Sequence, residues 1–520
     1  MIGMPLDEPI SRRVFLRRGA LASAAALVAA GMPGVPWLPG SGDADAAIMG
    51  MGQELSDTLN IETCNQIMIE SLKRGATFAD LFAEQRYMTS IVLDGGKLES
   101  VTYGYPRGAG VQVMFRQQAG YAFSDVVEFN SLLDAAHLAS SVVENRGPVS
   151  PVDLAVKPIM PVVSLSAPVP LMNEDLKFGF VRRFDEAARA VDPRIASVRV
   201  EYNDEVRDIL VATSEGVYVT DRQYLVSITC TVTAVEGPQR RTGFSAIGGR
   251  VDESYFTRRT PEAAGREAAE QALVLLQAGP APAGSMPVVT GPGWGGVLMH
   301  EALGHALEGE EISRGTSIIT GKLGTQIASP ALRVIDDARI PFGRGSYPVD
   351  DEGAIGQRTV LVDRGVLVSY VLDRQNAAIL GLKSTGNGRR MNYRYRALPR
   401  MSNTFIDRGS STPDSLLSGI KKGLYAAMLG VGGVDTTSGN FNFAVREGYL
   451  IENGQITRPV QGAVLVGNAL DALQKVEGIG NDIYIETAIG TCTKDGQRVP
   501  VGVGQPTVRF SSLTVGGTTV

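Results

Sequence analysis

The sequence predicts an α+β protein in which an N-terminal and a middle α/β unit precede a large β-rich C-terminal domain. Helix-like periodicity alternates with strand-like runs up to about residue 279, and short apolar runs separated by glycine dominate after it. The 520 residues include 61 glycines and 27 prolines, a composition that favours turns and closely spaced strands over a helical bundle. With 44% hydrophobic residues, the chain is long enough for several domains with their own cores.

The charge and cysteine content exclude two classes of protein. The formal net charge is −6, so the chain lacks the basic excess that nucleic-acid binding requires. Three cysteines in a chain of this length cannot build a disulfide framework. We therefore expect a globular protein that is not a disulfide scaffold and binds no nucleic acid.

Residues 1–46 are expected to be an export signal and not part of the fold. Arg12 and Arg13 precede an alanine-rich run, and a small-x-small pattern that a signal peptidase cleaves ends at Ala46. These features resemble a twin-arginine signal, which directs a protein to the periplasm or another extracytoplasmic compartment. A basic, uncleaved tail is the alternative. No later stretch reaches 18 apolar residues, so we expect no membrane span in the mature chain.

The N-terminal unit, residues 47–147, combines helical spacing with antiparallel strand patterns. The expected elements are a helix over 55–73, strands over 78–99 and 108–124 with a hairpin turn at 117–120, and a helix over 131–144 capped by Asn130 or Ser131. His137 lies within the last helix, where we expect a satisfied surface or core histidine and not a metal ligand.

A proline-rich linker, residues 148–172, separates this unit from the middle unit, residues 173–279. The middle unit is expected to contain a helix over 173–191, strands over 196–202, 209–212 and 217–235, and a helix over 260–276 whose first turn is Thr260-Pro261-Glu262. The C-terminal domain, residues 280–520, is expected to be mostly strand, with one helix near residue 300 and another over 414–429.

The most informative segment contains two of the three histidines. His300 and His305 flank Glu301 in an H-E-x-x-x-H pattern. In the H-E-x-x-H helix of zinc proteases the ligands share one face, but one extra residue places them about 140° apart on a regular α-helix. A π-type turn, which bonds residue i to i+5, restores the common face, and Gly304 lowers its steric demand. We therefore predict a π-type turn across 300–305; two unrelated histidines in a buried helix are the alternative.

A catalytic zinc site normally has three protein ligands, so a third residue is needed. Cys492 lies in a glycine-punctuated loop with Lys494 close enough to favour the thiolate, whereas the other two cysteines lie in stretches typical of small buried residues. Together with His300 and His305, Cys492 would leave one coordination position free for solvent. A free loop thiol is the alternative, and His137 could be a ligand only from a different domain.

Three stretches resemble the TldD/PmbA family of zinc metallopeptidases, and more narrowly its metal-binding TldD-like subunit. They are residues 297–310, the run 387–390 together with 399–404, and residues 492–506. The resemblance extends over about residues 55 to 515 and is most specific in the C-terminal half.

The resemblance implies one zinc ion per chain, bound by His300, His305 and Cys492, with Glu301 as the catalytic glutamate. It implies a peptidase that hydrolyses unfolded or short peptides in a cavity enclosed between subunits. The expected assembly is a dimer, either with a TldE/PmbA-like subunit or with a second copy of this chain.

Four further residues are candidate substrate contacts. Asp351 lies in a stretch similar to one near the substrate in that family, Arg389 and Arg390 could hold substrate carbonyls or carboxylates, and Tyr393 is a candidate oxyanion donor. A turn is the alternative for Asp351, and a structural loop is the alternative for Arg389 and Arg390.

Two other functions remain open from the sequence. One is a non-catalytic peptide-binding or assembly protein with a structural zinc, which would need a fourth protein ligand. The other is a zinc amidase that acts on a small peptide-like substrate.

Overall fold

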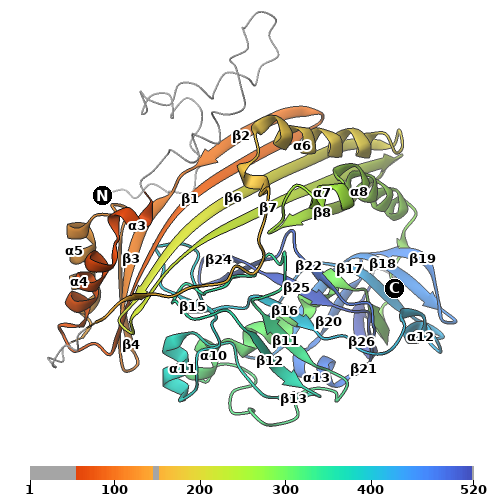
Figure 1. Ribbon diagram of the computed structural model, residues 1–520. Helices are drawn as coiled ribbons and strands as arrows, with labels where there is room; N and C mark the ends of the chain where they lie inside the picture. The colour runs from red at the N-terminus through yellow and green to blue at the C-terminus, as the bar shows by residue number, and fades with distance from the viewer. Residues whose placement is uncertain (1–53, 144–151, 518–520) are drawn as a thin grey trace, which may run out of the picture.

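The computed structural model describes residues 54–143 and 152–517 of the chain (Figure 1). The expected export signal, residues 1–46, lies outside the described residues. None of the helices in the described part of the chain has both the length and the apolar character needed to cross a membrane.

A long, mainly antiparallel sheet arches over the C-terminal domain (Figure 1). Its strand order is β4-β3-β1-β6-β7-β5, with β2 paired to β1 and β8 paired to β7. The strands are β1 Phe78–Asp94, β2 Lys97–Gly104, β3 Arg107–Phe115, β4 Gln118–Ser124, β5 Ala155–Val156, β6 Ile195–Thr213, β7 Val217–Glu236 and β8 Gln239–Gly249.

This sheet runs without a break from the N-terminal into the middle unit. Strand β6 pairs with β1 along fifteen consecutive residue pairs, from Asp80–Thr213 to Asp94–Arg199. The two strands expected over 196–202 and 209–212 are therefore one strand, because β1 and β7 supply ladder partners along its whole length. Part of the proline-rich segment joins the sheet as β5, which runs parallel to β7. The domain limits at 147 and 173 stay predictions.

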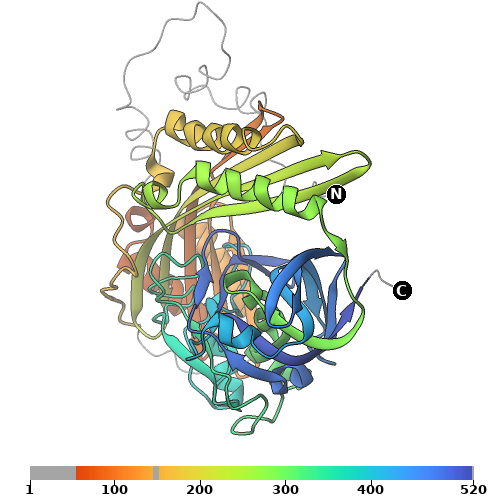
Figure 2. The ribbon, with the colours of Figure 1, turned by 90° about the vertical axis from the view of Figure 1, so that its right-hand side faces the viewer.

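Helices cover the outer face of this sheet, away from the C-terminal domain (Figure 2). Asn60, Asn173 and Thr260 each cap a helix by accepting a hydrogen bond from the backbone N–H three residues later. The expected cap at Asn130 or Ser131 is wrong, because that helix begins at Phe129 and Glu128 caps it without a side-chain bond. The helices are α3 Leu55–Thr58, α4 Ile61–Leu72, α5 Phe129–Ser140, the 3₁₀ turn η1 Val169–Leu171, α6 Glu174–Arg189, α7 Tyr255–Arg258 and α8 Pro261–Leu276.

The inner face of the sheet packs on the C-terminal domain. Phe82, Val211 and Val219 form one buried apolar cluster with Val349 and Tyr393. The neighbouring residues along these strands point to the helices on the other face, as the alternation of a strand requires. This part of the sheet is therefore covered by protein on both faces.

The C-terminal domain contains two larger sheets. In the first, β17, β10, β26, β20 and β18 follow one another and an additional β17–β18 pairing closes the ring; in the second, the order is β13-β12-β11-β16-β25-β22. Its strands are β9 Gly279–Pro280, β10 Gly284–Thr290, β11 Val334–Asp337, β12 Arg358–Asp363, β13 Val366–Leu367, β14 Gly388–Arg389, β15 Leu398–Pro399, β16 Asn403–Ile406, β17 Lys422–Val434, β18 Asn440–Glu452, β19 Gln455–Gln461, β20 Val464–Asn468, β21 Val476–Ile479, β22 Tyr484–Glu486, β23 Thr491–Lys494, β24 Gln497–Pro500, β25 Gly502–Gln505 and β26 Val508–Gly516.

Short helices connect these strands. They are the 3₁₀ turn η2 Gly293–Gly296, α9 Val297–Met299, η3 His300–Gly304, η4 His305–Leu307, α10 Gly309–Arg314, α11 Arg374–Leu380, α12 Pro413–Leu417 and α13 Ala469–Gln474. The expectation of a helix over 414–429 is wrong beyond Leu417. Gly419 adopts a left-handed φ of +78° and ends the segment, and strand β17 then pairs with β10 and β18.

The hairpin between β3 and β4 turns two residues earlier than expected, at Arg116 and Gln117. Gly120, expected in the turn, lies in β4 instead. A Cβ there would lie 1.9 Å from the carbonyl oxygen of Ala139 in α5, so glycine permits the close approach of helix and strand.

The contact between α8 and β8 can be tested with Gly243→Ala. A Cβ at this position would lie 1.9 Å from the carbonyl oxygen of Ala268 and 2.7 Å from the backbone nitrogen of Ala272. Because backbone must move to admit it, we expect the free energy of unfolding to fall by about 1–3 kcal/mol in denaturant titrations.

The matched control is Gly179→Ala, inside α6, where an added Cβ meets no heavy atom within 4 Å. Alanine in the interior of a helix should raise stability there by about 0.5–1 kcal/mol. Equal stability of Gly243→Ala and the wild type would contradict the described packing.

Candidate metal centre

The segment that contains the two histidines is a distorted helix. It begins as α9, widens to a π-type turn over His300–Gly304 and tightens to a 3₁₀ turn over His305–Leu307. The backbone N–H of His305 donates to the carbonyl oxygen of His300, which is the i to i+5 bond of a π-turn. The π-type turn predicted from the H-E-x-x-x-H spacing is confirmed.

Gly304 is needed for a reason other than the expected one. Its φ of −56° and ψ of −52° are ordinary helical values that any residue adopts. A Cβ there, however, would lie 2.1 Å from the sulfur of Met401. The glycine therefore permits close packing of the distorted helix and does not relieve backbone strain.

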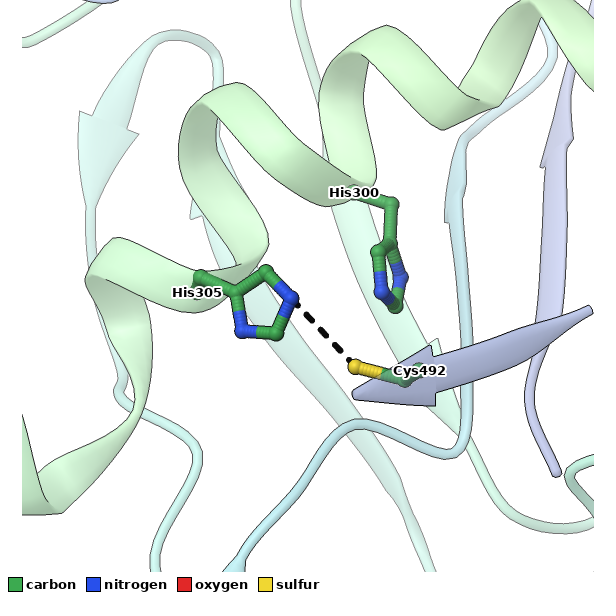
Figure 3. A group of neighbouring side chains, drawn as sticks. All are labelled: His300, His305 and Cys492. Atoms are coloured by element: carbon green, nitrogen blue, oxygen red, sulfur yellow. Dashed lines mark hydrogen bonds between the residues drawn. The ribbon is translucent and has the colours of Figure 1, made fainter. Parts of the chain in front are cut away.

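The structure brings Cys492 to both histidines (Figure 3). Cys492 lies in β23, which forms a two-stranded hairpin with β24, and its Sγ is 3.3 Å from Nε2 of His305. The rings of His300 and His305 have centroids 5.2 Å apart. One nitrogen of each ring and the sulfur all lie within 4.8 Å of one another.

This cluster has the chemistry of a zinc site. Both ring nitrogens of His300 are buried and have no hydrogen-bond partner among the described residues, a costly arrangement that a bound metal would relieve. Two imidazoles and one thiolate are a donor set that zinc accepts, and in catalytic sites three protein ligands are usual. The residues present therefore fit the ion.

The surroundings of Cys492 favour its thiolate. Burial alone would raise the pKa of this thiol, but the adjacent His300 and His305 lower its pKa well below the ordinary value. The thiolate is the form that binds metal ions. The expected effect of Lys494 on the sulfur is not what the contacts indicate, because the Lys494 ammonium lies 3.0 Å from Oε2 of Glu308.

Glu301 lies beside the cluster. One carboxylate oxygen is 3.8 Å from Nε2 of His305, and about a quarter of the side chain is exposed. A cavity of about 260 Å³ opens at this point, and its lining includes Trp294, His300, Glu301, Arg446 and Thr491. Glu301 and His300 therefore face the same cavity.

The buried carboxylate of Glu308 contacts Nδ1 of His305, the ring nitrogen that does not contact Cys492. Oε2 of Glu308 is 3.1 Å from Nδ1 of His305, and Oε1 is 3.5 Å from the guanidinium of Arg400. Burial would raise the pKa of Glu308, but His305 and Lys494 lower it to about 2, so the group is a carboxylate at neutral pH. Such a partner fixes the tautomer and orientation of a metal-binding histidine.

Glu308 and Arg400 were not among the site residues predicted from the sequence. Glu308 had a usable signal, because an acidic residue three positions after a candidate ligand is well placed to contact its ring. Arg400 had no such signal, because its contact with Glu308 forms only in the tertiary structure. His137, in contrast, lies on the surface with Nε2 3.3 Å from Glu70, which agrees with the expected satisfied histidine.

The four candidate substrate contacts do not lie together. Asp351, Arg389 and Arg390 line a second cavity, described below, which shares Thr491 with the first. Tyr393 lines neither cavity: its hydroxyl donates to Asp125 at 2.6 Å. Their contact with substrate stays a prediction.

The α+β fold, with a buried His-His-Cys cluster beside a glutamate, defines the class of this chain as a candidate metalloenzyme. Comparison with known proteins specifies it further. Models of the three PmbA/TldA metallopeptidase domains match residues 79–143 (domain 1), 168–276 (central domain) and 283–517 (C-terminal domain). The chain belongs to the TldD/PmbA metallopeptidase family.

Individual relatives agree with this assignment. The chain is 37% identical over 469 residues to a metalloprotease TldD homolog of Haemophilus influenzae, covering 88% of this chain and 97% of that protein. It is 35% identical over 460 residues to a metalloprotease TldD homolog of Buchnera aphidicola, covering 87% and 95%. The crystal structure of TldE from Thermococcus kodakarensis has the same fold, with a TM-score of 0.70, 19% identity, and coverage of 88% and 100%.

The positioning role of Glu308 can be tested with Glu308→Gln. The amide keeps the shape of the side chain but removes the charge that orients His305, so zinc affinity should fall about 10–100-fold in a chelator competition. Glu311→Gln is the control, because Glu311 also lies 3.5 Å from Lys494 but pairs with neither histidine. Unchanged zinc affinity in a folded Glu308→Gln protein would contradict the role.

Proposed function

We propose that this chain is a zinc-dependent peptidase that hydrolyses unfolded or short peptides. The observation that carries the proposal is the convergence of His300, His305 and Cys492 at a cavity that Glu301 also lines. Structural zinc sites use four protein ligands, whereas the group of candidate ligands in the described residues has three. This difference favours catalysis over a purely structural zinc.

Glu301 is the general base. When bound, zinc lowers the pKa of a coordinated water toward about 7 and polarises the carbonyl of the scissile bond. Glu301 accepts the proton of the attacking water and then passes it to the departing amine. Its position beside His305 but outside the ligand set suits that role.

The peptide lies in the first cavity as an added strand. Residues 428–432 of β17 line this cavity, and the register between β17 and β18 shifts repeatedly there. Val431 has no partner in that register and is 91% exposed. Backbone groups left without a regular partner can pair with an extended peptide, which gives affinity with little sequence preference.

The assembly that encloses the site is a dimer with a TldE/PmbA-like subunit or with a second copy of this chain. The similarity to a solved TldE structure and membership of the TldD/PmbA family support such a pairing. An enclosed site admits short or unfolded chains and excludes folded domains. An enclosed site would also admit the alternative class of substrate, small peptide-like amides.

The role of Glu301 is tested by Glu301→Gln in the zinc-loaded protein. Zinc content should persist, since Glu301 is not a ligand, while hydrolysis of an unfolded casein-like peptide should fall about 10²–10⁴-fold. Glu311→Gln serves again as a control for the loss of an acidic side chain near the site. Undiminished hydrolysis in Glu301→Gln would remove this residue from the reaction.

Export by a twin-arginine route is part of the proposal. Arg12→Lys combined with Arg13→Lys should leave the protein in the cytoplasm with its signal uncleaved, as measured by cell fractionation and the mass of the mature chain. The sequence supplies a control in the neighbouring pair Arg17 and Arg18, whose lysine variants should still be exported. Export of the first double variant would refute this part of the proposal.

A further inference from the structure

A second cavity, of about 160 Å³, lies beside the β23–β24 hairpin, which contributes Thr491, Arg498, Val499 and Pro500 to its lining. It is lined by seven arginines and two acidic residues, with contributions from the arched sheet and from the C-terminal domain. The charged residues of this lining are Arg86, Arg207, Arg250, Arg344, Arg389, Arg390, Arg498, Glu205 and Asp351. We call it the arginine cavity.

Three of these arginines are neutralised. Arg86 pairs with Glu84 and Glu205, at 3.0 and 3.3 Å. Arg207 pairs with Glu84 and with Asp351, at 2.9 and 3.2 Å. Arg390 pairs with Asp80 at 3.1 Å, and both side chains are fully buried. These pairs account for both acidic residues of the lining.

The other four arginines have no carboxylate partner within 4 Å among the described residues. They are Arg250, Arg344, Arg389 and Arg498. Arg344 and Arg389 instead donate to backbone carbonyls, those of Gly490 and Ala488 and those of Met401 and Pro500. The cavity therefore holds an excess of positive charge.

Arg250 is the least satisfied member of the group. It is 8% exposed, and within the described part of the chain its Nε has no hydrogen-bond partner and its one side-chain bond is a 3.4 Å contact with the amide oxygen of Gln223. Burial lowers its pKa to about 10 despite the charge of Asp221. Burying a guanidinium with no carboxylate in contact with it is unfavourable, and a bound anion would offset that cost.

The arginine cavity adjoins the metal centre. Thr491, the residue before the ligand Cys492, lines both cavities, and the consecutive residues Pro500 and Val501 line the second and the first. An extended peptide advances about 3.3 Å per residue, so a chain in the first cavity can bring a group a few residues away to this boundary.

We propose that the arginine cavity binds a carboxylate of the peptide substrate, either its C-terminal carboxylate or an Asp or Glu side chain. The inference rests on the proposed peptidase function and adds a charge preference to it. Guanidinium groups recognise carboxylates by charge-assisted and often bidentate hydrogen bonds. The protein should accordingly favour peptides with a negative charge near the scissile bond.

The test measures peptide binding to metal-free protein, so that it does not depend on hydrolysis. The probes are fluorescently labelled hexapeptides of neutral residues, with either a free or an amidated C-terminus, and amidated versions with one Glu or one Gln at each position in turn. We expect the best carboxylate-bearing peptide to bind about 10–100-fold more tightly than its neutral match. The better of the two series identifies which carboxylate is bound.

Variants assign the preference to the cavity. Arg250→Gln should abolish the difference in affinity between charged and neutral peptides, and Arg250→Lys should restore part of that difference. Arg240 is an exposed arginine outside the cavity, so Arg240→Gln should leave the difference in affinity unchanged. Because Arg250 is buried, Arg498→Gln on the exposed side of β24 is a second variant that should weaken the preference with less risk to folding.

Two results would overturn the inference. One is equal binding of charged and neutral peptides; the other is competition by inorganic phosphate without any effect of the peptide carboxylate, which would assign the cavity to a free anion. Charge-selective binding without zinc-dependent hydrolysis would instead contradict the proposed peptidase function. Hydrolysis without charge selectivity would leave that function in place and refute this inference.

Discussion

The contact between the sulfur of Cys492 and the ring of His305 joins two segments 187 residues apart, and the rest of the site depends on it. The distorted helix supplies both imidazoles from one short stretch, but the third donor must come from the β23–β24 hairpin. The π-type turn aligns the rings with each other, and the position of the hairpin then decides whether a three-donor set exists at all.

Arginines fix that hairpin through its backbone. Arg344 donates to Gly490, just before β23, and Arg389 donates to Pro500, at the end of β24. Arg400 reaches Gln497 at 3.3 Å and also faces Glu308, the carboxylate behind His305. One guanidinium thus touches both the hairpin that holds Cys492 and the residue that orients the histidine.

Local sequence patterns predicted what local geometry determines. The histidine spacing was sufficient for the π-type turn, and the start of the helix at Thr260 was predicted because proline and glutamate favour the first helical turn. The segment over 414–429 was predicted wrongly because its strand is stabilised by β10 and β18, which no local pattern indicates. The Cys492 ligand could be proposed by elimination among three cysteines, whereas its approach to His305 required the tertiary structure.

The arginine cavity could not be predicted from the sequence for a similar reason. Its lining comes from β1, β6, β7 and the residue that follows β8, and from several separate stretches of the C-terminal domain. Arg389 and Arg390 were singled out as neighbours, yet one holds the hairpin and the other is buried against Asp80 and Phe82 of β1. Adjacent residues on an extended segment point in opposite directions, and only their surroundings assign each a role.

The contact between the arched sheet and the C-terminal domain has a consequence for dissecting the protein. Fully buried charges meet across it, including Arg390 with Asp80 and the backbone of Tyr393 with Glu84. A fragment cut near residue 280 would retain every candidate zinc ligand but would expose these groups without their counterparts. Such a fragment would also keep every residue that lines the first cavity, so truncation would dismantle the arginine cavity, which both parts of the chain build.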